Sequence, residues 1–198
     1  MRVMVVGCGG LGGFVIEELA RIGVRDLVLV DGDTFCESNL NRQLESGLDT
    51  LGRNKAEVYG ERLRNKWGRE VGAIPDFLSE RNAHLVAEVD LVMDCVDTIE
   101  ARLLLEKICA KYDKILVHGG LEGSCGQACL CYPDEETLAR LYGGKQEEKH
   151  STNVCTVATV ASLQVELVRK LLLGEEEQIK GKLVLANLDS FAIDVVNI

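Results

Sequence analysis

The chain has 198 residues, of which 46% are apolar and 27% are charged, and its formal net charge is −10 at pH 7. This length and composition fit one soluble globular domain over residues 1–198. So acidic a chain is a poor partner for phosphate backbones, and we expect no nucleic-acid partner. The longest uncharged run, 151–165, is too short and too polar to span a bilayer, so we expect a cytoplasmic protein without a membrane segment.

The first thirty residues predict a β-α-β unit. Met4–Val6 is a short apolar strand, and a glycine turn follows it directly. Apolar residues then recur at helical spacing, at Leu11, Val15, Leu19 and Ile22. Asp26–Val30 is a second apolar strand that ends at Asp31. A crossover of this kind is right-handed and predicts a parallel pair of strands.

Strands and helices continue to alternate as far as residue 117. The patterns predict helices over Ala56–Trp67 and Ile99–Lys111, and strands at Val71–Ile74, Asp90–Met93 and Lys114–Val117. Regular alternation of strand and helix is typical of an α/β fold. We therefore predict a Rossmann-like, doubly wound, mostly parallel sheet with helices on both faces.

The last third of the chain has a different character. We predict a strand at Gln127–Tyr132 and then a polar, turn-rich loop over 143–153, which is a candidate mobile lid over the site. Thr156–Leu173 is a long and widely apolar helix. Lys182–Leu188 and Phe191–Val196 flank a turn and predict a closing C-terminal antiparallel hairpin.

A glycine loop lies between the first strand and the first helix, with Gly7, Gly9, Gly10, Leu11 and Gly12 as its key positions. Glycine lets the backbone approach a phosphate, and the helix N-terminus offers free N–H groups and a positive dipole end. Asp31 ends the second strand, where an acidic residue can accept hydrogen bonds from ribose hydroxyls. Alone, these features fit NAD as well as ATP.

Cationic and amide side chains after the second strand distinguish between ATP and NAD as the ligand. Asn39, Asn41, Arg42 and Gln43 are close together at the expected carboxyl edge of the sheet, and Lys55 begins the next helix. A triphosphate under cleavage needs positive charge where negative charge develops, and Arg42 and Lys55 supply it. A solvated basic pair is the plain alternative. A dehydrogenase would have no role for these two cations.

Two aspartates follow the fourth strand. Asp97 lies just past the strand, where a carboxylate can hold Mg²⁺ together with substrate oxygens. Its alternative role is to cap the N-terminus of the next helix. Asp94 is nearer the strand, and we expect it to cap the turn that follows.

The chain contains eight cysteines, at positions 8, 36, 95, 109, 125, 129, 131 and 155. In a reducing compartment these are thiols rather than a disulfide framework. No C-x-x-C pair occurs, so we expect no zinc site.

Five short segments occur in a fixed order: Gly7–Gly12, Asp31–Asp33, Ser38–Gln43, Gly52–Lys55 and Asp94–Asp97. Together they make the chain resemble the ThiF/MoeB/HesA family, the bacterial relatives of ubiquitin-activating enzymes. The likeness continues through 162–164 to the final hairpin and covers nearly the whole chain, as in a short member without zinc.

The resemblance implies an adenylyltransferase, in which a carboxylate attacks the α-phosphorus of Mg-ATP and pyrophosphate leaves. It implies that Asp31 holds ribose, that Asn39, Arg42 and Lys55 bind phosphates, and that Asp97 holds Mg²⁺. The expected nucleotide site is completed by the glycine-loop residues with Asp33, Gln43, Cys95 and Val96. No general base is required, since a carboxylate is already ionised at neutral pH.

In many relatives the carboxylate is the C-terminal glycine of a ubiquitin-like sulfur-carrier protein of thiamine or molybdopterin biosynthesis. Others act on small acids or on a modified tRNA base. Cys155 falls where relatives carry a cysteine that takes part in sulfur transfer, although a packing role is the alternative. The resemblance also implies a homodimer.

Two departures from the family pattern concern the site. Thr98 stands where Asn is usual, and Met1 lies almost at the first strand, without the N-terminal segment that commonly carries an arginine. A nucleotide-binding scaffold without chemistry and an NAD-dependent dehydrogenase are the alternatives from other classes.

Overall fold

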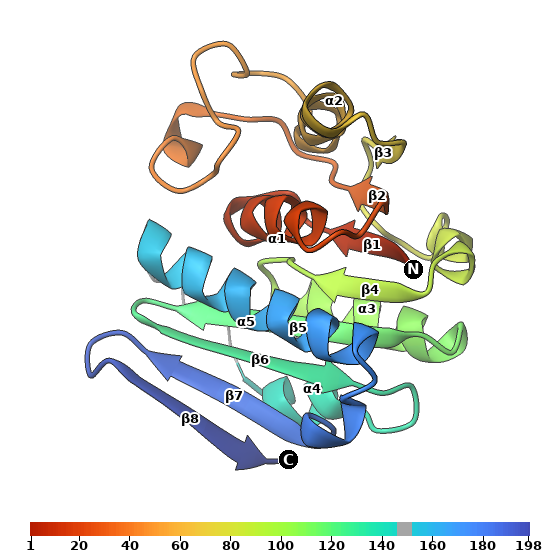
Figure 1. The fold of residues 1–198 in the computed structure, drawn as a ribbon, viewed down its shortest axis with the longest axis vertical. Coiled ribbons are helices and arrows are strands. Elements are labelled where there is room, and N and C mark those ends of the chain that lie inside the picture. The colour runs from red at the N-terminus through yellow and green to blue at the C-terminus, as the bar shows by residue number, and fades with distance from the viewer. Residues whose placement is uncertain (146–151) are drawn as a thin grey trace.

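An eight-stranded sheet forms the centre of the computed structural model, which describes residues 1–145 and 152–198 (Figure 1). The strands are β1 (Arg2–Val6), β2 (Asp26–Val30), β3 (Val71–Ile74), β4 (Leu91–Asp94), β5 (Ile115–Glu122), β6 (Cys125–Cys131), β7 (Lys182–Asn187) and β8 (Ala192–Asn197). The α-helices are α1 (Gly10–Arg21), α2 (Lys55–Trp67), α3 (Ile99–Lys111), α4 (Thr137–Tyr142) and α5 (Val154–Leu172). Short 3₁₀ helices occur at η1 (Glu37–Asn39), η2 (Ala83–Glu88) and η3 (Glu176–Gln178).

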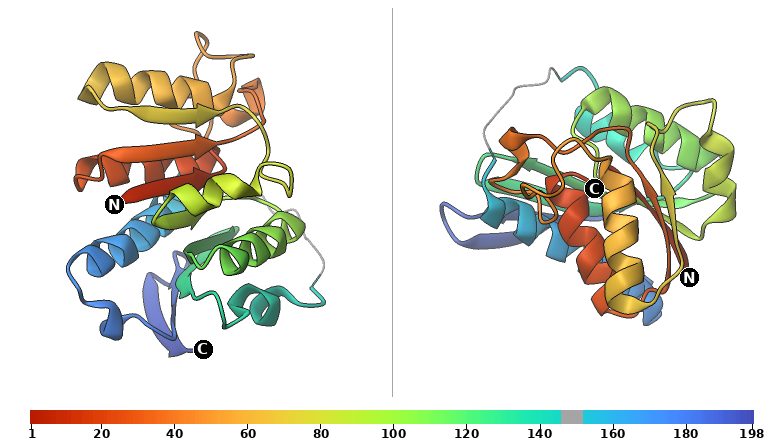
Figure 2. Two further views of the ribbon diagram at one scale, coloured as in Figure 1. Left: turned by 90° about the vertical axis from the view of Figure 1, so that its right-hand side faces the viewer. Right: turned by 90° about the horizontal axis from the view of Figure 1, so that it is seen from above.

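Helices cover both faces of the sheet, as the two views of Figure 2 show. Helices α1, α2 and α5 pack on one face, and α3, α4 and η2 lie on the other. Side chains alternate between the two resulting cores, so that Val3 and Val5 face the first while Met4 and Val6 face the second. Burial on both faces explains why the parallel strands are almost continuously apolar. Among the described residues, no helix combines the length and apolar character needed to cross a lipid bilayer.

The order of the strands is β3-β2-β1-β4-β5-β6-β7-β8. The first five are parallel, and β6, β7 and β8 continue the sheet in antiparallel fashion. This confirms the predicted doubly wound sheet with its C-terminal hairpin. The chain passes from one side of β1 to the other between β3 and β4, so the switch point lies between β1 and β4. Ligands of such sheets bind in the crevice at the carboxyl ends of the strands beside this point.

Three differences from the predicted elements lie in the second half. Strand β5 extends to Glu122, five residues beyond the predicted end, because Gly119 and Gly120 allow it to pass under neighbouring side chains. A Cβ at Gly119 would lie 2.3 Å from Gln164 Cδ, and one at Gly120 would lie 2.5 Å from the Tyr142 hydroxyl. Helix α4 was not predicted, and α5 begins two residues earlier than expected. Of the loop predicted over 143–153, residues 146–151 lie outside the described residues.

Side-chain caps fix the N-termini of three helices at the carboxyl edge of the sheet. Asn54 caps α2 by accepting from the Glu57 N–H, and Asn153 caps α5. Thr98, and not Asp97, caps α3 by accepting from the Ala101 N–H. The alternative role of Asp97 as a helix cap is therefore wrong.

Gln164 joins α5 to the centre of the sheet. The side chain is fully buried, and its amide donates to the carbonyl oxygens of Asp94 and Val117, both at 3.0 Å. Gln164→Leu would leave both buried carbonyls without this donor, and each such loss costs about 1–3 kcal/mol. We expect a clearly lower free energy of unfolding in urea, followed by circular dichroism. The exposed Ser162→Ala on the same helix removes one surface hydrogen bond, to Glu18, and should cost less, about 0.5–1.5 kcal/mol. Equal losses in both variants would contradict the role of Gln164.

Candidate nucleotide site

The glycine loop and the loop after β4 touch at the switch point. Gly7 has φ of +91°, and a Cβ there would lie 2.5 Å from the Cys95 carbonyl oxygen. A Cβ at Gly12 would lie 1.8 Å from the Gly7 carbonyl oxygen. No larger residue fits either position without moving the backbone, so packing alone requires these glycines.

Helix α1 presents an uncapped N-terminus at this loop. Gly9 is its N-cap and provides no side-chain hydrogen bond, and its first turn contains no acidic residue. The first N–H groups of a helix have no partner within the helix, so this end can bind an anion. The buried Leu11 anchors the same turn in the core.

The Asp31 carboxylate is held at the end of β2 by two backbone N–H groups. Its Oδ2 accepts from the Cys8 N–H at 2.6 Å, and its Oδ1 accepts from the Asp33 N–H at 2.8 Å. Burial raises the pKa of Asp31, while these hydrogen bonds and the Lys55 charge oppose the rise. Each carboxylate oxygen retains a free lone pair, which can accept from a sugar hydroxyl.

Lys55 is directed by Asp33. The ammonium lies 3.1 Å from Asp33 Oδ2, and the side chain is only 8% exposed although it ends in a charge. Asn54 fixes the backbone around the pair, since its amide donates to the carbonyl oxygens of Asp31 and Asp33. The structure thus brings Asp31, Asp33 and Lys55 into one cluster.

The segment after η1 lies along the glycine loop. A Cβ at Gly10 would lie 3.6 Å from Arg42 Cγ. The Arg42 guanidinium donates to the Ser38 carbonyl oxygen at 2.9 Å and to Asn41 Oδ1 at 2.8 Å. Asn39 is buried, and its Oδ1 accepts from the Cys36 N–H at 3.2 Å. Asn39 therefore shapes this turn, and Arg42 lies beside the predicted phosphate position.

Gln43 carries a buried polar atom that the described part of the chain leaves unsatisfied. The residue is 7% exposed, and its Oε1 has no hydrogen-bond partner among the described residues. Its Nε2 lies 3.6 Å from the position of a Cβ at Gly9. Buried polar atoms without a partner are rare, so an unsatisfied amide against the glycine loop indicates a place for a polar ligand.

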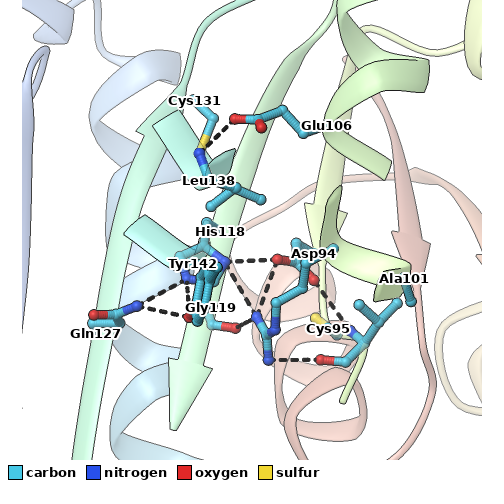
Figure 3. A network of polar contacts seen from close by, with 12 residues as sticks. Asp94, Cys95, Ala101, Glu106, His118, Gly119, Gln127, Cys131, Leu138 and Tyr142 are labelled. Carbon is cyan, nitrogen blue, oxygen red and sulfur yellow. Dashed lines mark hydrogen bonds and ion pairs between the residues drawn. The ribbon is translucent and has the colours of Figure 1, made fainter. Parts of the chain in front are cut away.

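Asp94 is fully buried and forms the centre of a polar network (Figure 3). Its Oδ1 accepts from the Val96 N–H at 3.2 Å, which confirms its predicted role in the turn. Its Oδ2 accepts from His118 Nδ1 at 2.6 Å and from Arg102 Nη1 at 3.1 Å. Burial alone would raise the pKa of Asp94, but the Arg102 charge and the His118 hydrogen bond hold it below its ordinary value.

The rest of this network was not predicted from the sequence. The Tyr142 hydroxyl lies 3.0 Å from His118 Nε2, and Gln127 Nε2 donates to that hydroxyl at 2.7 Å (Figure 3). One signal was present in the sequence. Arg102 and Glu106 occupy the buried face of α3, and two charged residues within an apolar stripe indicate buried polar partners.

Asp97 and Cys155 complete the same edge. Asp97 is exposed in the loop between β4 and α3 and follows Val96, whose neighbour Cys95 packs against Gly7. Cys155 is exposed in the first turn of α5. Val157, from the same turn, lies 3.6 Å from the position of a Cβ at Gly10. Residues close in sequence to Asp97 and to Cys155 therefore contact the glycine loop, which places both side chains near it.

Protein ligands alone do not form a metal centre in the described ranges. There, no three His, Cys, Asp or Glu side chains cluster so that they could hold a metal ion. Mg²⁺ in a nucleotide site typically takes one or two carboxylates and completes its shell with phosphate oxygens and water. The single exposed carboxylate of Asp97 fits that pattern.

The whole chain, residues 1–198, matches the ThiF family. It is 35% identical over 192 residues to the SAMP-activating enzyme E1 of Haloferax volcanii, which covers 92% of this chain and 71% of that protein. It is 33% identical over 193 residues to the molybdopterin-synthase adenylyltransferase of Escherichia coli, which covers 93% of this chain and 78% of that protein. The chain belongs to the ThiF family, and the predicted resemblance is confirmed.

A solved structure shows the same fold. The crystal structure of E. coli MccB with ATP matches with a TM-score of 0.80 at 21% sequence identity. The match covers 99% of this chain and 63% of the MccB chain. The chain thus spans less than two thirds of that protein.

Stability should depend on pH through His118. Burial lowers the pKa of His118 below its ordinary value of 6.5, against the opposing effect of Asp94. The imidazole therefore binds a proton more tightly in the unfolded state than in the folded state. Above pH 6.5 His118 is neutral in both states and its contribution to stability is fully present. This contribution is lost as the pH falls toward the pKa of the folded state. We expect the free energy of unfolding to fall from about pH 7 to about pH 5. His118→Asn should flatten this slope, whereas the exposed His84→Asn should leave it unchanged. The same slope in all three proteins would contradict the assignment.

Proposed function

We propose that the chain is an ATP-dependent adenylyltransferase that activates a carboxylate as an acyl-adenylate and releases pyrophosphate. The observation that carries the proposal is the cluster of Asp31, Asp33 and Lys55 beside an uncapped helix N-terminus at the switch point of the sheet. Membership of the ThiF family supports it. A dehydrogenase is not favoured, because it gives the cations at this edge no role.

The donors and acceptors of the site match the parts of ATP. Asp31 would accept from the ribose, and the N–H groups of the α1 N-terminus would bind phosphate oxygens. Lys55 and Arg42 would neutralise the phosphate chain. The unsatisfied Gln43 Oε1 is an acceptor, so its partner would be an O–H or N–H donor of the nucleoside and not a phosphate oxygen. These residues therefore fit a nucleoside triphosphate better than an uncharged ligand.

The reaction follows from these positions. A carboxylate oxygen of the acceptor attacks the α-phosphorus, the bond between the α-phosphorus and the bridging oxygen breaks, and pyrophosphate takes the electron pair. The acceptor is already ionised, so the protein orients the two reactants and stabilises the developing charge. Mg²⁺ held by Asp97 would neutralise phosphate charge during this step.

The acceptor that fits best is the C-terminal glycine of a ubiquitin-like sulfur carrier. The names of the two relatives support it, since one is a SAMP-activating E1 and the other a molybdopterin-synthase adenylyltransferase. A small-molecule or cofactor-precursor carboxylate is the second candidate. Relatives named tRNA threonylcarbamoyladenosine dehydratase support only the wider point that substrates in this family are not all proteins. The cytoplasmic location and the homodimer stay predictions.

Arg42→Ala should abolish most of the adenylation. Removing one preorganised donor from such a transition state typically lowers turnover by about 10²–10³-fold. The measurement is exchange of labelled pyrophosphate into ATP with a purified sulfur carrier that ends in glycine. Arg53→Ala is the matched control, because Arg53 is exposed and pairs with Glu61 on the outer side of α2. Unchanged exchange in Arg42→Ala would remove Arg42 from the mechanism.

Cys155→Ser should separate the two halves of the pathway. Exchange of pyrophosphate should stay at the wild-type level, because Cys155 is not needed to form the acyl-adenylate. Later transfer of sulfur or of the acyl group should stop, which mass spectrometry of the carrier would detect. Cys125→Ser is the control, since Cys125 is also exposed but lies on β6. Loss of exchange in Cys155→Ser alone would contradict this division.

A further inference from the structure

Arg102 bonds to the loop after β4 and to the backbone of strand β5. The residue is 7% exposed, and its Nη2 donates to the Val96 carbonyl oxygen at 2.8 Å. Its Nη1 donates to the Gly119 carbonyl oxygen at 2.6 Å and pairs with Asp94 Oδ2 at 3.1 Å. One planar guanidinium thus satisfies two backbone carbonyls and one buried carboxylate.

The bond to Val96 bears directly on Asp97. The Val96 carbonyl belongs to the peptide unit that contains the Asp97 nitrogen, so Arg102 fixes the plane from which Asp97 projects. On the other side, Thr98 is fixed by its hydrogen bond from the Ala101 N–H at 3.2 Å. The Asp97 carboxylate itself is in exposed surroundings, and no hydrogen bond or ion pair to it occurs among the described residues. The backbone is held on both sides of a carboxylate that no described residue engages.

The same loop is fitted to the glycine loop. The Cys95 carbonyl oxygen would lie 2.5 Å from a Cβ at Gly7, and Cys95 Cβ would lie 3.3 Å from one at Gly12. The Cys95 N–H also donates to the Val6 carbonyl oxygen at 3.0 Å. A shift of Val96 would therefore change the place of Asp97 relative to the phosphate-binding backbone.

We propose that Arg102 is a positioning residue for divalent-metal binding, because it holds the Val96–Asp97 peptide unit so that the Asp97 carboxylate meets the metal at the nucleotide. The inference rests on the proposed function. Lysine can replace the charge beside Asp94, but a single ammonium cannot reproduce the planar set of hydrogen bonds to Val96, Gly119 and Asp94. Arg102→Lys therefore tests geometry while it keeps the charge.

The experiment measures the dissociation constant of an α,β-methylene analogue of ATP by calorimetry, in EDTA and in Mn²⁺. The wild-type protein should bind more tightly with Mn²⁺. In Arg102→Lys the constant in EDTA should stay within about twofold, while the gain from Mn²⁺ should fall by about tenfold, in the range typical for residues that orient metal ligands. Asp97→Asn should lose the same gain. The double variant should lose no more than Asp97→Asn, because the two residues act through one carboxylate.

Tyr142→Phe is the matched control. It keeps the ring, whose centroid lies 5.6 Å from the Arg102 guanidinium carbon, and removes only the hydroxyl, which contacts His118 and Gln127 and not the loop 95–97. Its gain from Mn²⁺ should equal that of the wild type. If Arg102→Lys does not fold, the pair Asp94→Asn with Arg102→Gln removes both buried charges together and should show the same loss.

Two results in the Arg102 variants would overturn the inference. In the first, Mn²⁺ increases the affinity of the Arg102 variants for the analogue as much as it does for the wild type. This result would leave the proposed function intact. In the second, the variants lose affinity for the analogue equally in EDTA and in Mn²⁺, which would make Arg102 a general structural residue. A wild-type protein that binds the analogue no better with Mn²⁺ would overturn the metal role of Asp97 and this inference together. Absence of pyrophosphate exchange in the wild type is the separate result that counts against the proposed function.

Discussion

Contact between the loops after β1 and β4 is the constraint on which the site depends. The Gly7 backbone and the Cys95 carbonyl oxygen approach so closely that a single Cβ would separate them. This contact places the uncapped N-terminus of α1 beside the loop that carries Asp97. Because the strands are parallel neighbours, both loops emerge at the same edge, and the chain can bring residues about ninety positions apart to one ligand.

A buried ion pair between Asp94 and Arg102 holds the loop after β4 in place. Asp94 and Arg102 are both withdrawn from water, and charges in such a place are expensive unless every group is hydrogen-bonded. Here the carboxylate accepts from Val96, His118 and Arg102, so its demand is met. The network joins β4, the loop after it, α3, β5 and α4 (Figure 3). A buried polar network whose groups are all hydrogen-bonded makes a fold more rigid.

Short helix α4 shows how the polar network extends into the fold. Its N-terminal N–H groups, at Leu138 and Ala139, donate to the Glu106 carboxylate on α3. Its last residue, Tyr142, contacts His118 from the other end. Six residues are too few for a stable helix alone, so α4 exists because these tertiary partners hold both of its ends.

The sequence by itself determined the order of the elements, the glycine loop and the acidic end of β2, because periodicity and glycine signatures are local properties of the chain. It also indicated which residues belong to the predicted nucleotide site at the carboxyl edge of the sheet. Only the tertiary structure decided which of them meet. Lys55 forms an ion pair with Asp33, and the Asn39 side chain accepts a hydrogen bond from Cys36 within its own turn. Arg102 and His118 converge on Asp94. Strand β5 runs past Gly119 because Gln164, 45 residues later, fills the space of the missing side chain. Such pairings depend on contacts between distant segments, and no local pattern in a single sequence specifies them.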